Sequence, residues 1–428
     1  MPQPSALQSA RSFLGTVAED SVRCDRGLDS VPHNEAGLRC LAADGNWSAV
    51  AELAERLSAA ATEETAEGLS KRLQFILVQV TANFHMQRYN VAKKLVESLG
   101  DLNSERYIDP KTSESTVPFS LRFISAIIPL YIGTKMDSQQ RLYALLRDCR
   151  ENLGKYASAV WVARIKRVQR ALVVSHYQVE QYSEALRIYN ELIAVEGNAD
   201  GDDMGSYALL RRMLHLHQFA ALALFCGNAS FANSIYQSIA SINVSEAAPC
   251  VQNFHECLVD FNTGIWLSFN GKVQDSMKVF CDVATKSREY YCALGASQLM
   301  STDVPTVSNR QLKFVADGCD ALALSELCRH AFHQLLVNAT TSHVVTMPYE
   351  ALRGKAPATM LGGTIRTMED YLRNDPVGLL SSDAFISNGV RLYTLEGGTQ
   401  MRRLELLNDL IEVFRCDRAS APPIDKIV

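Results

Sequence analysis

The sequence lacks the short motifs by which common catalytic sites are recognised. It has no P-loop, no Gly-x-Ser-x-Gly turn, no His-Glu-x-x-His helix and no dinucleotide-binding fingerprint. Its eleven cysteines are scattered, without the Cys-x-x-Cys pairs of zinc and redox sites. Cys328, His330 and His333 lie close together, but a metal site needs further ligands, so we interpret them as core or surface residues. We therefore expect a protein that is not an enzyme and needs no cofactor.

The chain also lacks strong charge and a targeting signal. A net charge of −5 over 428 residues provides little attraction for nucleic acid or anionic lipid. Residues 1–15 lack the basic and apolar regions of a signal peptide. Positions 213–245 hold no Lys, Arg, Asp or Glu, but His215 and His217 interrupt them. They predict a buried helical hairpin, or a surface covered by a partner protein, rather than a membrane span. We expect a cytoplasmic chain with reduced thiols, no nucleic-acid partner and no transmembrane segment.

Helical patterning is what the chain has in abundance. Only 13 residues are proline, and the apolar residues, 47% of the chain, recur mostly at intervals of three and four. The pattern predicts an all-α protein with a flexible lead-in over residues 1–33, a helical array over 34–416 and a tail over 417–428. The last helix, residues 400–415, has an apolar face that can cap the array.

Five similar turns divide the array into pairs of helices, at residues 45–50, 87–92, 180–185, 227–232 and 271–276. Each opens on a small or polar residue, and most carry a small residue five positions on; three have an aromatic residue four positions later. This is the pattern of a tetratricopeptide (TPR) repeat, in which the small residue lets two helices touch and the aromatic fills the gap to the next pair. The predicted fold is a TPR-like α-solenoid of antiparallel helix pairs, with packing residues Tyr182, Ala185, Tyr189, Ala232, Tyr236, Ser276 and Phe280.

The spacing of the turns exceeds the TPR period of about 34 residues. The equivalent positions Val50 and Ala92 are 42 residues apart, and Ala185 and Ala232 are 47 apart. Longer helices or loops are expected to take up the excess. No consensus turn is recognised between Ala92 and Ala185.

That gap contains the most distinctive stretch of the chain, residues 115–133. Pro118 suits the first turn of a helix, and the following run is apolar on most sides, with Phe119 and Leu121 expected in the core. A proline near its end is expected to kink the helix, and Gly133 to end it. The helix is interpreted mainly as a packing element, with partner binding as the alternative.

Basic residues are the candidates for contacts with a partner. Arg122 is the single charge on the apolar helix and needs either water or an acidic group. A basic run follows at Arg164, Lys166, Arg167 and Arg170, which is either a solvated face or the site of an acidic partner. Arg170 falls at a position that co-chaperone TPR domains use to clamp a peptide carboxylate, but Ala171 and Val174 stand where their asparagines are expected.

The central stretch resembles a known family. Residues Thr116–Arg122 (T-V-P-F-S-L-R), with Pro129–Gly133 and Arg141–Tyr143 downstream, closely resemble the TPR region of subunit 12 of the TRAPP (transport protein particle) complex. In that family a tyrosine-containing loop precedes V-P-F-S-L-R, and Tyr107–Pro110 occupies its place. The closing stretch Asn388–Glu396 is also similar, and the resemblance covers residues 35–416.

This resemblance implies a non-catalytic scaffold subunit of a TRAPP III-like assembly, beside subunits 8, 11 and 13. Such complexes tether vesicles and activate Rab GTPases by nucleotide exchange at their small core subunits, so this chain would meet Rab only through the complex. The implied setting is ER-to-Golgi vesicle transport, with autophagy as a further candidate, at the cytoplasmic surface of intermediate-compartment or Golgi membranes. The alternative is a peptide-binding TPR adaptor of the co-chaperone or import-receptor type. The implied partner contacts are Val117, Pro118, Phe119, Ser120, Leu121 and Arg122.

Overall fold

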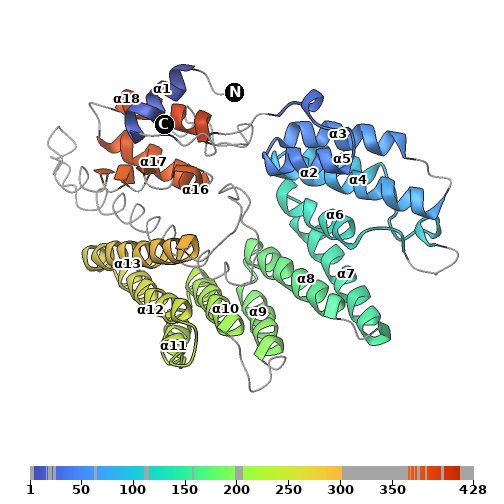
Figure 1. Ribbon diagram of the computed structural model, residues 1–428. Helices are drawn as coiled ribbons and strands as arrows, with labels where there is room; N and C mark the ends of the chain where they lie inside the picture. Colours follow the sequence, from blue (N-terminus) through green and yellow to red (C-terminus); the bar gives the residue numbers. More distant parts are fainter. Residues whose placement is uncertain are drawn as a thin grey trace. The chain divides into compact units, whose positions relative to one another are not determined.

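The computed structural model describes residues 4–15, 26–61, 65–109, 115–156, 159–197, 206–300, 376–380, 383–396 and 400–414, with positions 17, 22, 365, 366, 368–370, 372 and 373 besides. These residues are helical and contain no strand, although one isolated β-bridge joins Ile108 and Ser115. The helices are α1 (Pro4–Leu14), α2 (Glu35–Ala43), α3 (Trp47–Ala60), α4 (Ala66–His85), α5 (Tyr89–Glu97), α6 (Phe119–Ile132), α7 (Lys135–Tyr156), α8 (Ala159–Gln178), α9 (Tyr182–Gly197), α10 (Ser206–Phe225), α11 (Ala229–Ala240), α12 (Pro249–Phe269), α13 (Val273–Met300), α16 (Pro376–Leu380), α17 (Asp383–Glu396) and α18 (Gln400–Phe414), with short 3₁₀ helices at Leu28–Ser30 and Glu105–Tyr107 (Figure 1).

The chain divides into two compact units. The first, called the α2–α9 unit, comprises Asp25–Ala199 and Leu222–Gly227, and the second, the α10–α18 unit, comprises Met1–Cys24, Asp200–Ala221 and Asn228–Val428. In the α2–α9 unit each helix packs against the next in the chain. In the α10–α18 unit α12 packs between α11 and α13, while α16, α17 and α18 pack together. The prediction of an all-α, TPR-like α-solenoid of antiparallel helix pairs is confirmed, although the single array expected over residues 34–416 is divided between the two units.

Each of the five expected turns begins with a residue in the left-handed backbone region. The angle φ is 71° at Gly45, 57° at Gln87, 64° at Glu180, 79° at Gly227 and 77° at Gly271. The N–H of each donates to the carbonyl three residues before it, at 2.9–3.1 Å. These bonds close the end of the first helix in the manner of a Schellman cap, so the chain reverses within three residues and starts the second helix.

The residue five positions after each left-handed residue is buried where the paired helices touch, and it is small in every turn but the first, which has a valine. Its N–H donates to the carbonyl four residues back, at 3.0–3.1 Å. In the pair formed by α12 and α13, the Ser276 hydroxyl also donates to the carbonyl of Gly264 at 2.7 Å, which ties the two helices together. A large side chain at this position would hold the helices apart. The residues concerned are Val50, Ala92, Ala185, Ala232 and Ser276, all at most 1% exposed.

A sixth turn of the same kind joins α6 to α7, in the gap where none was recognised. Gly133, with φ of 96°, ends α6. Ser138 is fully buried, and its hydroxyl donates to the carbonyl of Ala126 at 2.6 Å, twelve residues back, the same separation as in the α12–α13 pair. The expectation of no turn here is wrong: Gly133 and Ser138 have the same spacing as Gly271 and Ser276 in the fifth turn, although Leu142 stands where three of the other turns have an aromatic residue.

Side chains at the turns also link each helix pair of the α2–α9 unit to the next. In each of these pairs, the first residue of the second helix contacts a residue near the end of the first helix of the following pair. That residue lies two positions before the left-handed residue of the following turn. The contact is ring stacking in the first two cases and a hydrogen bond in the third, but it joins equivalent positions each time. The contacts are Trp47 stacked on His85 with ring centroids 3.9 Å apart, Tyr89 stacked on Tyr131 at 4.7 Å, and Lys135 Nζ donating to the carbonyl of Gln178 at 3.0 Å.

Helix α1 corrects the expectation of a flexible lead-in for residues 4–14, because it packs against α18. Ala6 and Ala10 are buried in this contact region, and the Arg373 guanidinium lies 4.4 Å from the ring centroid of Phe13. Its buried residues are small and its partners lie hundreds of positions away in the chain, so periodicity alone did not reveal it. The apolar face expected on α18 is buried, at Leu404, Leu407, Leu410, Ile411 and Phe414.

Replacing Gln87 by glycine is expected to stabilise the protein. A side chain in the left-handed region strains the backbone, whereas glycine adopts it freely, so Gln87→Gly should raise the free energy of unfolding by about 0.5–1 kcal/mol. Urea unfolding followed by circular dichroism measures the change. Gly45→Ala is the matched reverse exchange and should lower stability by about 1 kcal/mol. Unchanged or reduced stability of Gln87→Gly would contradict this account of the turns.

Replacing Gly264 by alanine is expected to destabilise the contact between α12 and α13. The added methyl would lie 2.7 Å from the fully buried ring of Phe280. Such overpacking should lower the free energy of unfolding by about 1–3 kcal/mol. Gly154→Ala on α7 is the control, since its added methyl meets nothing within 4 Å. The control should be neutral or slightly stabilising in thermal melts; equal losses in both variants would argue against close contact at Gly264.

Candidate protein-interaction surface

The V-P-F-S-L-R block, residues 117–122, enters α6 from a loop that Tyr107 fastens. Tyr107 is 2% exposed, and its hydroxyl donates to the carbonyl of Leu99 at 2.7 Å. The N–H and the hydroxyl of Thr116 both donate to the carbonyl of Tyr107, at 2.8 and 3.0 Å. Val117 and Leu121 then continue into the core that α4, α5 and α6 share. The inner half of the block therefore positions the start of α6.

The outer half of the block presents aromatic and polar groups at the start of the helix. Pro118 is the N-cap residue and makes no side-chain cap, so α6 begins one residue later than expected, at Phe119. Phe119 is only half-buried, unlike the fully buried Leu121, and its ring stacks on Phe123 with centroids 6.2 Å apart. The sequence interpretation placed Phe119 in the core, whereas in the structure its ring is only partly buried and faces a side chain of α8.

Two arginines of the basic run on α8 cover these rings. The guanidinium carbon of Arg164 lies 5.0 Å from the ring centroid of Phe119 and 4.3 Å from that of Trp161. That of Arg167 lies 4.4 Å from the ring centroid of Phe123, and its Nη1 donates to the hydroxyl of Ser120 at 3.4 Å. Trp161 and Phe123 were not among the predicted site residues. The spacing of Phe119 with Phe123, and of Arg164 with Arg167, is the sequence signal that could have suggested them.

Arg122 lies beside this cluster and is half-buried. Its Nη2 donates to the hydroxyl of Ser115 at 2.6 Å, while its Nε is buried without a hydrogen-bond partner among the described residues. Burial lowers the pKa of the Arg122 guanidinium, Asp148 opposes that effect, and the positive charge of Arg164 adds to it. Arg122 is thus a cation held in a partly dry site next to a second cation.

The downstream motif residues make structural contacts. Pro129 inside α6 has no N–H for the carbonyl of Ser125, and Arg141 Nη1 on α7 donates to that carbonyl at 3.2 Å instead. The hydroxyl of Tyr143 lies 2.8 Å from Nε2 of the buried His176, which joins α7 to α8. Burial raises the pKa of the Tyr143 hydroxyl. These contacts join α6 to α7 and α7 to α8.

The predicted TPR packing residues occupy two environments. Tyr182 differs from the rest, since it is 37% exposed at the turn and lies against Tyr177, with ring centroids 5.8 Å apart. The others are buried between helices, namely Ala185, Tyr189, Ala232, Tyr236, Ser276 and Phe280.

The stretch without charged residues, 213–245, forms the end of α10, a turn and α11. The rings of Phe219 and Phe231 meet across this hairpin, with centroids 5.3 Å apart. The outer face of α11 is exposed and rich in serine; Ser234 and Ser238, for example, donate their hydroxyls to backbone carbonyls of the same helix. The hairpin is therefore only partly buried.

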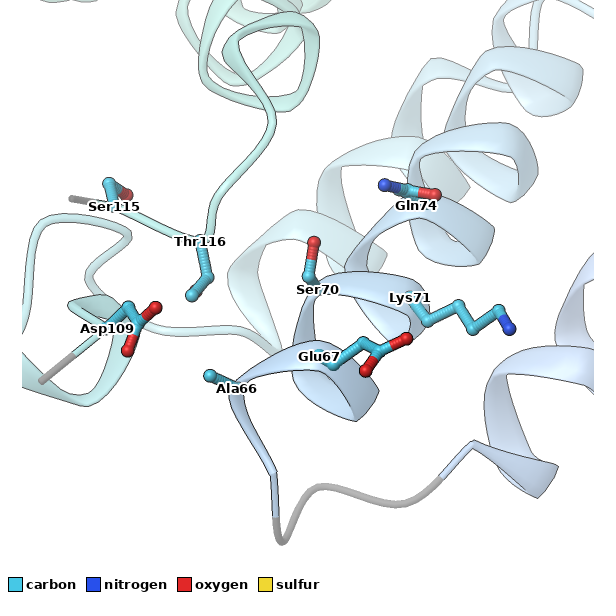
Figure 2. A pocket seen from close by; sticks show the side chains of 8 residues that line it. All are labelled: Ala66, Glu67, Ser70, Lys71, Gln74, Asp109, Ser115 and Thr116. Atoms are coloured by element: carbon cyan, nitrogen blue, oxygen red, sulfur yellow. The ribbon is translucent and has the colours of Figure 1, made fainter. Parts of the chain in front are cut away.

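A hollow of about 550 Å³ lies beside the loop that precedes α6 (Figure 2). Its lining is hydrophilic and carries both signs of charge, without the apolar anchor that small-molecule sites usually have. The lining residues are Ala66, Glu67, Ser70, Lys71, Gln74, Asp109, Ser115 and Thr116.

None of the other sites considered from the sequence gains support for a catalytic, metal-binding or peptide-binding role from the described residues. Cys328, His330 and His333 lie outside the described residues; within the described part, no three His, Cys, Asp or Glu side chains are grouped to hold a metal ion. Burial raises the pKa of the Cys149 thiol to about 11, which makes it a poor nucleophile.

No described helix is both long and apolar enough to cross a bilayer. Ala171 and Val174 leave the clamp position at Arg170 without its expected asparagines.

Comparisons with known proteins add little to this surface. No family model and no curated protein matches the sequence. One solved structure that is similar is that of Naa15/Naa10 bound to HypK-THB, at 10% identity and a TM-score of 0.20. The match covers 87% of this chain and spans 62% of that chain. A superposition this poor carries over no property of that complex.

Replacing Leu121 by alanine is expected to destabilise the fold far more than replacing Phe119. Leu121 is fully buried, so Leu121→Ala should lower the free energy of unfolding by about 2–5 kcal/mol. Phe119 is half-buried, and Phe119→Ala should cost about half as much. Chemical unfolding of the two variants compares them directly. A larger loss for Phe119→Ala would mean that its ring, and not Leu121, anchors the start of α6.

Proposed function

We propose that the chain is a non-catalytic scaffold subunit of a TRAPP complex of the TRAPP III type. The observation that carries the proposal is the V-P-F-S-L-R block at Val117–Arg122, set in a TPR-like helical repeat after the Tyr107 loop. A helical repeat suits a scaffold because each helix pair contacts mainly its neighbours and leaves long lateral surfaces for other proteins.

The arrangement of the block supports a role in both packing and binding. Val117 and Leu121 are buried, which holds α6 against α4 and α5. Phe119, Ser120 and Arg122 remain partly accessible and lie beside the basic face of α8. These accessible groups are the part of the block that a partner protein would reach.

In this proposal the direct partners are TRAPP subunits 8, 11 and 13, and the core subunits and the Rab GTPase are met only through the complex. The exchange reaction is assigned to other subunits and no step of it to this chain. The protein would act in ER-to-Golgi vesicle transport, with autophagy as a further process. It would work in the cytoplasm, at the surface of intermediate-compartment or Golgi membranes.

Affinity purification tests this proposal. The tagged chain, expressed at its natural level in its source cell, is expected to recover several TRAPP subunits in near-equal amounts, identified by mass spectrometry. A tagged TPR protein of the co-chaperone type serves as the control bait and should recover none. Repeated recovery of intact, folded bait without any TRAPP subunit would rule out the assignment.

A further inference from the structure

Three arginines from α6 and α8 come together on one surface of the α2–α9 unit. Arg164 and Arg167 lie over aromatic rings, and Arg122 is held by a serine hydroxyl. Within the described ranges, none of the three forms an ion pair with a carboxylate. Like charges this close disfavour one another, and the effect of Arg164 on the pKa of Arg122 has that sign. Asp148 and Asp101 offset part of the charge at Arg122 without forming an ion pair with it, so the cluster of three arginines keeps a net positive charge.

The way these arginines are held keeps them ready for a carboxylate. A guanidinium that lies on a ring face still has its N–H groups in its own plane, directed away from the ring. The rings limit the freedom of Arg164 and Arg167, so less conformational entropy is lost when a ligand binds. Carboxylate groups match the fork of an arginine with two parallel hydrogen bonds.

Apolar groups border the charges. Val160, at the start of α8, is 55% exposed, and Trp161 and Phe119 are each half-buried. A ligand with carboxylates alone would leave these groups in contact with water. A segment that combines carboxylates with an apolar side chain would satisfy both parts of the surface.

We propose that the surface formed by Arg122, Arg164 and Arg167, with Phe119 and Trp161, binds an acidic segment of a partner protein in which Asp or Glu alternates with apolar residues. This inference rests on the scaffold role proposed above but not on the identity of the complex. The occupant is a protein segment, because the positive charge is compact and set in a chain of net charge −5. Nucleic acids and anionic membranes favour broader basic surfaces.

Fluorescence anisotropy of the full chain with synthetic peptides tests the proposal. The probe is a short labelled peptide in which Glu and Asp alternate with Leu, and its matched control carries Gln and Asn in their place. The full chain is expected to bind the acidic peptide and not the amide peptide. Arg164→Gln with Arg167→Gln should weaken binding by about tenfold or more, because charge-assisted hydrogen bonds are lost.

A matched pair of substitutions separates this surface from general electrostatics. Lys94→Gln with Lys278→Gln removes the same amount of charge from exposed positions that are not part of the cluster, and should change affinity less than about twofold. Thermal melting by circular dichroism checks that each variant is folded. Should the glutamine pair fail to fold, Arg164→Lys with Arg167→Lys keeps the charge but loses the fork, and should still weaken binding several-fold.

Several results would overturn the inference. These are no binding of the acidic peptide, unchanged binding by the folded arginine variants, or an equal loss in the lysine control. Arginine-dependent binding to phosphatidylserine vesicles in preference to the peptide would assign the surface to a membrane instead. Failure here while TRAPP subunits still co-purify would reject this surface alone. Peptide binding without TRAPP subunits would reject the proposed complex and support the surface.

Discussion

The fold depends on one local constraint, a three-residue reversal that begins with a left-handed residue and is followed by a buried small residue. The left-handed residue lets the end of the first helix satisfy its last carbonyls, and the small residue lets the second helix approach closely. Both requirements must be met within six positions of the chain. Six turns of this kind, from Gly45 to Ser276, set the pairing of α2 through α13.

Long helices follow from the wide spacing of these turns. With Ser138 included, the buried small residues are 42, 46, 47, 47 and 44 positions apart, against about 34 in a TPR repeat. Helices α4, α7 and α8 accordingly run for 20, 22 and 20 residues. At the ends of the helices where the turns lie, neighbouring pairs are joined by the recurring contacts between Trp47 and His85, Tyr89 and Tyr131, and Lys135 and Gln178. No such recurring contact joins the opposite ends of these helices among the described residues. The surface formed by the three arginines with Phe119 and Trp161 lies at those ends, at the start of α6 and in the first half of α8.

One half of the V-P-F-S-L-R block packs into the core, and the other half belongs to the proposed binding surface. Leu121 and Val117 are held by the core, so the start of α6 has little freedom to move. Arg164 and Arg167 can therefore settle on rings whose positions are already determined. Such a surface pays little entropy on binding, which is the property expected of a scaffold that joins several proteins.

Local interactions in the sequence determined the helices and five of the turns, because periodicity, capping and left-handed residues act within a few positions. The sixth turn carries the same local signal, a glycine followed five positions later by a small residue, and differs from three of the other turns in having Leu142 in place of an aromatic residue. The charges of Arg122 and the α8 run were visible, and so was the choice between water and an acidic partner. Only the tertiary structure decided that Phe119 lies under Arg164 and that α1 packs on α18. Those contacts join residues far apart in the chain. They depend on which helices pack together and on how far one helix is shifted along the other, and no local sequence pattern encodes either.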